Sequence, residues 1–315
     1  MSSRNTDWVA VGALSLLSTL IFQTGTFFLI FPAPLQFLRG KTDRRHFTTG
    51  CVVTVVLIGA IVAWRSAAAP TELRSVALYD GLVPIGLIIA LWVTNELTMR
   101  SGKTAALAVA GAVAGLIALP SVSVLTESEA FRSQLAAQFA AAEEAISGFS
   151  GGAGIDEVFG VDDPAELFAA LWMRTFAGGF TIMIGVNYLI GARLSRTIGD
   201  RMLERYRTPH WLPFALLIGL AGIVLESTFA FVPAGYLGWN LLVFTAAVFA
   251  AQAVGLLQFL VGADGTRPGR RALVPLGLIA LFLIPLTGGL VSIGLPILGI
   301  IEHWMRRRDR GIGVA

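Results

Sequence analysis

Eight long apolar runs follow one another along the 315-residue chain and restrict the folds open to it. They are Trp8 to Leu38, Phe47 to Trp64, Ala77 to Thr98, Thr104 to Leu125, Leu167 to Leu194, Trp211 to Val232, Leu237 to Val261 and Leu273 to Trp304. About 20 apolar residues in a helix are enough to cross a bilayer. Charged residues make up only 14% of the chain, against about 25% in typical soluble proteins. The sequence therefore predicts an all-α, polytopic membrane bundle in which residues 1–315 form a single integral membrane domain.

The first and last runs, with 31 and 32 residues, are longer than one crossing needs. Each contains a natural break. The stretch Gln23 to Thr26, with Gly25, interrupts the first run, and Pro285 with Gly288 and Gly289 interrupts the last. Either run forms two short spans, a re-entrant hairpin or one long tilted helix. We therefore expect 8 to 10 crossings.

Basic residues are concentrated in alternate loops, which predicts the orientation in the membrane. Fourteen of them lie in one set of loops: Arg39, Lys41, Arg44, Arg45, Arg100, Lys103, Arg193, Arg196, Arg201, Arg205, Arg207, Arg267, Arg270 and Arg271. The other loops hold only Arg65, Arg74 and Arg132. Because cytoplasmic loops carry the excess of Lys and Arg, the fourteen should face the cytoplasm, together with both chain termini. All but two of the basic residues are arginines, which favours a bacterial protein, and we expect it in the cytoplasmic (inner) membrane.

Residues 126–166 form an acidic insert between the fourth and fifth runs, and we expect it outside the cell. Apolar residues recur there at spacings of three and four, which predicts one amphipathic external helix: Phe131, Leu135, Phe139, Ala142, Ile146 and Phe149. This helix is either a lid over an external cavity or an anchor on the membrane surface. Asp163, Pro164 and Glu166 then supply a cap, a first-turn proline and an acidic residue for the next helix.

A carboxylate, Glu226, stands inside the otherwise apolar run Trp211 to Val232. An unpaired charge near the middle of a bilayer costs about 2.5 to 3.5 kcal/mol, so the chain must provide a partner or a cavity. Arg174 is the best candidate, because counting from the outer helix ends places the two residues about 12 and 9 Å deep. Asp80 and Asn240 lie near the same outer boundary. The cluster is either a ligand-binding or ion-binding site formed by all four residues, or a structural ion pair with polar neighbours.

Other polar and small residues within the spans are expected to hold helices together. Asn187, Gln252 and Gln258 lie deep in apolar runs, where amides form interhelical hydrogen bonds. Glycines such as Gly219 and Gly222 let helix backbones approach closely. These residues predict packing and carry no chemistry of their own.

The sequence lacks the motifs of common enzymes. It has no GxxxxGK[ST] phosphate loop, no GxSxG elbow and no HExxH, so we expect no enzymatic activity and no cofactor. His46, His210 and His303 are far apart in sequence, and we expect no metal site. The single cysteine, Cys51, excludes an intramolecular disulfide and is expected to be a small buried apolar residue. Because the basic residues lie in short loops, we expect the lipid bilayer and not nucleic acid as a partner.

Several short stretches carry a family resemblance. They are Arg205, Pro209 and Pro213 at the start of a span, Asn240, QAVGL at Gln252 to Leu256, GLPILGIIEHWMR at Gly294 to Arg306, and Pro32 with Pro34 before a basic loop. With these stretches the chain resembles the YybS-like family of bacterial membrane proteins, a domain of unknown function (2232). That family is distantly similar to the S components of energy-coupling-factor transporters and to the rod-shape protein MreD.

The resemblance implies two roles. Similarity to S components implies a small-molecule-binding or transport subunit that works with membrane or ATPase coupling subunits. Similarity to MreD implies an envelope-associated scaffold with no small-molecule ligand. The sequence leaves both open.

Overall fold

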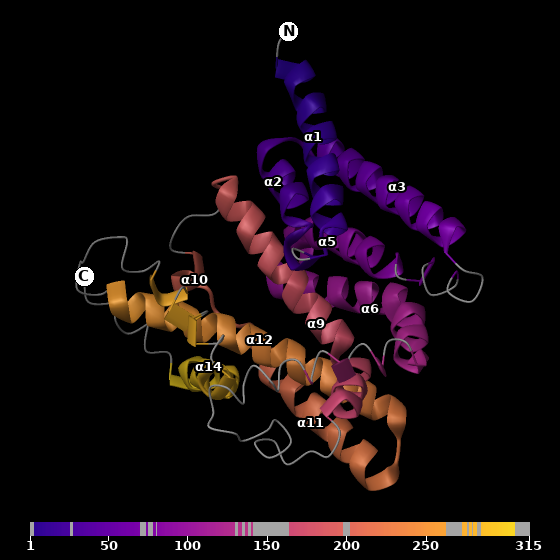
Figure 1. Ribbon diagram of the computed structural model, residues 1–315. Coiled ribbons are helices and arrows are strands. Elements are labelled where there is room, and N and C mark those ends of the chain that lie inside the picture. Colours follow the sequence, from indigo (N-terminus) through magenta and orange to yellow (C-terminus); the bar gives the residue numbers. More distant parts are fainter. Residues whose placement is uncertain are drawn as a thin grey trace.

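The computed structural model describes residues 3–25, 28–69, 74, 78–79, 81–129, 132–133, 136–137, 140, 164–197, 202–262, 273–275, 277–278, 280–281 and 285–305. Within these residues the chain forms helices and no strands, as the sequence predicts. The main elements are α1 (Ser3–Gln23), the single turn η1 (Phe28–Ile30), α2 (Ala33–Lys41), α3 (Arg44–Ala68), α5 (Leu82–Ser101), α6 (Lys103–Glu127), α9 (Pro164–Leu194), α10 (Met202–Arg205), α11 (Leu212–Phe229), α12 (Val232–Gly262) and α14 (Pro285–Met305). Figure 1 shows their arrangement.

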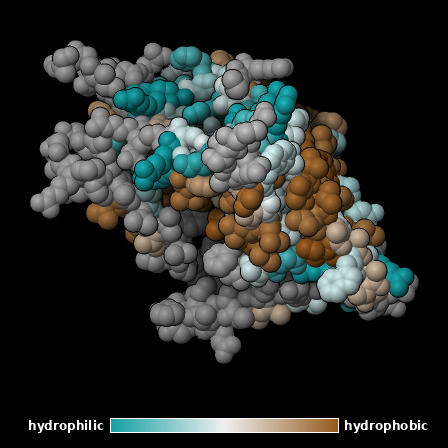
Figure 2. Space-filling view, turned by 90° about the horizontal axis from the view of Figure 1, so that it is seen from above, coloured by the Kyte–Doolittle hydropathy of each residue, from teal (hydrophilic) through white to brown (hydrophobic). Residues whose placement is uncertain are grey.

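Among the described helices, six are long and apolar enough to cross a membrane: α3, α6, α9, α11, α12 and α14. Two shorter apolar segments are Asp7–Gln23 in α1 and Leu82–Thr98 in α5. At most 44% of any of the six apolar windows is buried within the protein, so more than half of each is at least partly exposed. Figure 2 shows a face on which such apolar side chains form a continuous area. Large exposed apolar surfaces of this kind are expected where lipid is the solvent, and the structure is that of a membrane protein.

Contacts between helix ends show which ends share a side of the bundle. The Trp8 ring of α1 lies 4.6 Å from the His46 ring of α3, measured between centroids, so both helices begin at one end. Glu96, near the C-terminal end of α5, pairs with Arg44 at the start of α3. Helix α6 begins directly after α5, and its Thr104 contacts Tyr206, which follows α10. Because three of the predicted cytoplasmic loops meet here, we call this the basic end.

The break predicted in the first apolar run is present. Helix α1 ends at Gln23, and Gly25 follows with a positive φ of 66°, a conformation that glycine adopts without strain. The chain then turns back, because the Ser18 hydroxyl donates to the Phe31 carbonyl at 2.6 Å. The alternative prediction of one long tilted helix over the first run is therefore wrong. In the last run, α14 begins at Pro285, where the second break was predicted.

Helix α9 lies between the two halves of the bundle, as Figure 1 shows. On one side it joins a core built from helices α1 to α6, in which the largest fully buried side chains include Phe31, Phe47, Leu91 and Ile184. On the other side it packs against α12, which in turn carries α11 and α14. Residues of α9 therefore contact both halves of the bundle.

Glycines allow α11 and α12 to run in backbone contact. A Cβ on Gly222 of α11 would lie 2.5 Å from the Ala234 carbonyl oxygen, and one on Gly238 of α12 would lie 2.6 Å from the Gly219 carbonyl oxygen. No side chain fits at such distances, so the predicted packing role of Gly219 and Gly222 is confirmed. The predicted hydrogen bond from Asn187 to another helix is also present. The buried Asn187 side chain donates to the Leu29 carbonyl in η1 at 2.7 Å.

The acidic insert 126–166 falls mostly outside the described residues. This includes all six apolar positions of the predicted amphipathic helix, so that helix stays a prediction. The start of the following helix is confirmed, since α9 begins at Pro164 and carries Glu166 in its first turn.

Candidate functional site

The predicted ion pair between α9 and α11 is present. Arg174 donates to Oε1 of Glu226 from Nε at 3.1 Å and from Nη2 at 3.0 Å. The Glu226 side chain is 14% exposed and that of Arg174 is 37% exposed, so the carboxylate is the more deeply placed partner. Two hydrogen bonds from one guanidinium thus provide the partner that a carboxylate in an apolar helix requires.

Asn240 of α12 lies beside this pair and binds the backbone of α9. Its Nδ2 donates to the Arg174 carbonyl oxygen at 2.7 Å, and its Oδ1 accepts from the Gly178 amide at 2.8 Å. These two backbone groups are four residues apart and bond to each other in a regular α-helix. The Asn240 amide therefore bridges one turn of α9 and fixes α12 against it. Asn240 was predicted to belong to the cluster, but not to bind the backbone of α9.

The Glu226 carboxylate is also packed against the start of α12. A Cβ on Gly235 would lie 2.0 Å from Oε2 of Glu226, so any other residue there would force the Glu226 side chain to move. Arg174, Glu226 and Asn240 thus join α9, α11 and α12 at one point. Asp80, the fourth residue of the predicted cluster, lies outside the described residues. The three contacts are those of a structural junction, and ligand binding by the cluster stays a prediction.

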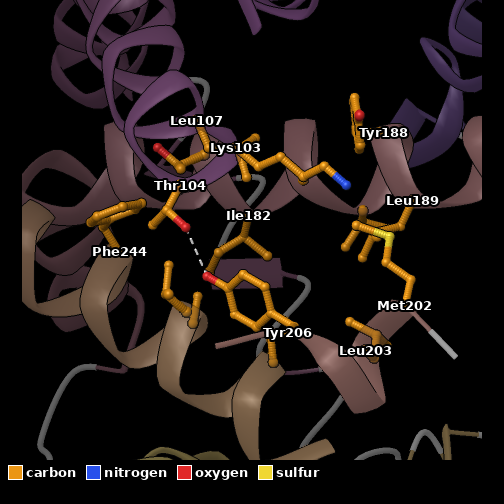
Figure 3. A pocket seen from close by; sticks show the side chains of 16 residues that line it. Lys103, Thr104, Leu107, Ile182, Tyr188, Leu189, Met202, Leu203, Tyr206 and Phe244 are labelled. Atoms are coloured by element: carbon orange, nitrogen blue, oxygen red, sulfur yellow. Dashed lines mark hydrogen bonds between the residues drawn. The ribbon is translucent and has the colours of Figure 1, made fainter. Parts of the chain in front are cut away.

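A cavity of about 160 Å³ lies elsewhere, nearer the basic end and between α6, α9, α10 and α12. Sixteen residues line it: Lys103, Thr104, Leu107, Thr181, Ile182, Gly185, Val186, Tyr188, Leu189, Met202, Leu203, Tyr206, Phe244, Ala247, Val248 and Ala251. Figure 3 shows ten of them by name. The set is mostly aliphatic and aromatic, so the cavity favours an apolar occupant.

Two residues of α9 that line the cavity are also exposed on the outside of the protein. Ile182 and Val186 of α9 line it and are nevertheless 40% and 43% exposed. They are one turn apart and therefore lie on the same face of α9. Because α9 is one of the six helices long and apolar enough to span a membrane, we expect this side of the cavity to face lipid.

Polar groups gather at the end of the cavity where α6 begins. Lys103 is the first residue of α6, and Figure 3 shows its side chain reaching across the cavity towards Tyr188 and Leu189. The hydroxyl groups of Thr104 and Tyr206 lie 2.9 Å apart and form a hydrogen bond. Burial raises the pKa of Tyr206, and the bond to Thr104 opposes this only partly. The phenol is therefore neutral at physiological pH, and Lys103 is the charged group of the lining.

A second polar group lies where the loop before α11 meets α12 and α14. The Thr208 amide donates to Oε1 of Gln252 at 2.9 Å, so in this bond the buried side chain joins α12 to the loop before α11 and not to another helix. The Thr208 hydroxyl lies 2.6 Å from Nδ1 of His303, whose ring centroid is 6.1 Å from that of His210. These contacts hold the basic end of the C-terminal half together.

No protein-family model, no curated protein and no solved structure matches this chain. The resemblance to the YybS-like family therefore stays a prediction, together with the roles it implies. The function is therefore inferred from the geometry of the described residues.

Proposed function

We propose that the protein is a multi-pass protein of the bacterial cytoplasmic membrane that binds a small molecule with an apolar part, as a binding or transport subunit. In this proposal it crosses the membrane 8 to 10 times, and its basic end and both termini face the cytoplasm. Coupling subunits or other membrane proteins are its expected partners. The proposal is carried by one observation, the apolar cavity between α6, α9, α10 and α12.

The size of the cavity restricts its ligand. Pockets that enclose a drug-sized molecule have volumes of about 300 to 1,000 Å³, whereas an engineered apolar cavity of about 150 Å³ holds benzene. At about 160 Å³, the cavity has room for an apolar segment and not for a whole vitamin-sized molecule. The ligand therefore inserts part of itself and leaves the rest outside the protein.

The exposed side of the cavity supports entry from the bilayer. Ile182 and Val186 are exposed on a spanning helix, so an apolar group passes from lipid into the cavity without crossing water. A ligand that is already dissolved in the membrane needs no other path.

A cavity-filling variant tests the proposal. Ala247→Leu replaces a methyl group in the wall of the cavity with an isobutyl group. It should lower the amount of co-purified small molecule per protein, measured by native mass spectrometry from mild detergent. Ala221→Leu is the matched control, because Ala221 is exposed on α11 and does not line the cavity. Equal occupancy in the wild type and in Ala247→Leu would refute the proposal.

The scaffold role is a second candidate, and the junction at Arg174 favours it. Arg174, Glu226 and Asn240 fix three helices to one another, as a rigid protein that only recruits partners requires. A scaffold of this kind predicts that the wild type carries no specific small molecule, so the same experiment separates the two roles.

A further inference from the structure

The polar end of the cavity indicates the chemical class of its ligand. Lys103 contributes an ammonium group to a lining that is otherwise mostly apolar. A molecule that matches both features has an apolar chain and an anionic group at one end. We propose that the cavity binds one acyl chain of an anionic phospholipid, with the lipid phosphate held by Lys103. This inference rests on the proposed function and gives its ligand a class.

The position of Lys103 in its helix strengthens the charge argument. Helix α6 has 25 residues and begins at Lys103, and the preceding Gly102 provides no side-chain cap. The start of a helix carries a partial positive charge, so a lysine there adds to a charge of the same sign. An anion beside Lys103 would offset both charges, and helix starts are common binding sites for phosphate groups.

The hydroxyl pair at this end offers a further donor. Of the two hydroxyl groups of Thr104 and Tyr206, one donates its proton in the bond between them. The other group keeps its proton, which can be donated to a third atom such as a phosphate oxygen. Because burial raises the pKa of Tyr206, the phenol keeps its proton at physiological pH.

The depth of the cavity suits a lipid whose headgroup lies at the membrane surface. Along α9 the lining runs from Leu189 to Thr181, about 12 Å at about 1.5 Å per residue. The lysine is thus near the basic end, and the apolar walls extend from it towards the middle of the bundle. Basic pockets between membrane helices on the cytoplasmic side are known binding sites for lipid headgroups. A free phosphate or a polar metabolite would contact Lys103 but would not fill the space between the apolar walls.

Lipid exchange into purified protein tests the inference. We would remove co-purified lipid, add phosphatidylglycerol or phosphatidylcholine of the same acyl length, and count bound lipid by native mass spectrometry. The wild type should prefer phosphatidylglycerol. Lys103→Gln should lose about fivefold of that preference, the effect expected for one lysine at a membrane surface. Lys103→Arg should keep most of it.

Lys41 provides the matched control, as it is the only other lysine of the chain. It is exposed at the end of α2, where its ammonium lies 5.9 Å from the centroid of the Phe37 ring, and it does not line the cavity. Lys41→Gln should therefore leave the lipid preference unchanged.

Three outcomes would overturn the inference. The first is an unchanged preference in Lys103→Gln, and the second is an equal loss in Lys41→Gln. The third is displacement of the lipid by millimolar inorganic phosphate, which would show that the site recognises the free anion. A failure of the proposed function looks different, because lipid of either kind would then bind equally to the wild type and to Ala247→Leu.

Discussion

Breaking the pair between Arg174 and Glu226 should destabilise the protein, and the structure sets the size of the effect. Removing one partner of a buried ion pair costs about 3 to 5 kcal/mol, whereas an exposed pair is worth about 0.2 to 1 kcal/mol. The Glu226 side chain is 14% exposed and Arg174 37% exposed, so this pair lies between the two limits. We therefore expect Arg174→Met to lower the free energy of unfolding by about 1 to 3 kcal/mol, because it leaves a mostly buried carboxylate without its cation.

The assay is a double-mutant cycle on thermal unfolding in detergent. The four proteins are the wild type, Arg174→Met, Glu226→Gln and the double variant, and the double variant should be more stable than the sum of the single losses predicts. A coupling of about 1 to 2 kcal/mol is expected for groups in direct contact. The pair of Arg44 with Glu96 is the internal reference, because its arginine is 69% exposed and its coupling should be smaller.

Equal coupling in the two cycles would contradict this prediction. Additive losses at Arg174 and Glu226 would also contradict it, since they would mean that the two side chains do not contact each other in the folded protein.

Three further predictions concern packing, pH and orientation. Gly222→Ala should lower the melting temperature, because the new Cβ would lie 2.5 Å from a carbonyl oxygen of α12. Overpacking of this kind lowers the free energy of unfolding by about 1 to 3 kcal/mol. Gly12→Ala is the control and should leave the melting temperature unchanged, because a Cβ at Gly12 meets open space. Asp43→Ala should lower the melting temperature at pH 7, because the Asp43 carboxylate accepts hydrogen bonds from His46 at the start of α3, which lower its pKa. The stabilisation that Asp43 gives the fold is therefore complete above the ordinary pKa of 3.8 and is lost as the pH falls through the lowered pKa. In a Cys51→Ser background, single cysteines at Lys41 and Glu129 should react with an impermeant maleimide from opposite sides of the membrane, and labelling of both from one side would refute the orientation.

The helical membrane fold could be predicted because long apolar runs leave few alternatives. The break after Gln23 was also predictable, since Gly25 interrupts an overlong run and adopts a positive φ. The return of the chain through η1 and α2 could not be predicted from the spacing of apolar residues. Helix α2 has only nine residues, and its burial depends on contacts with α9, which is distant in sequence.

The candidate site was predictable only in part. A carboxylate in an apolar helix requires a partner, and counting residues from the helix ends identified Arg174 for Glu226. The role of Asn240 could not be read in the same way, since its partners are backbone groups of another helix. The cavity was missed because no single helix carries a signal for it. Lys103 matched the pattern of cytoplasmic basic residues, which concealed its place in a cavity wall.

The proposed membrane lipid in the cavity between α6, α9 and α12 can be seen directly. An experimental density map of the wild type in nanodiscs that contain phosphatidylglycerol should show a continuous tube of density between Ile182 and Phe244. This density should end in a phosphate peak within hydrogen-bonding distance of Nζ of Lys103. A cavity that is empty or closed by its own side chains, with no ordered lipid beside Lys103, would contradict the proposal.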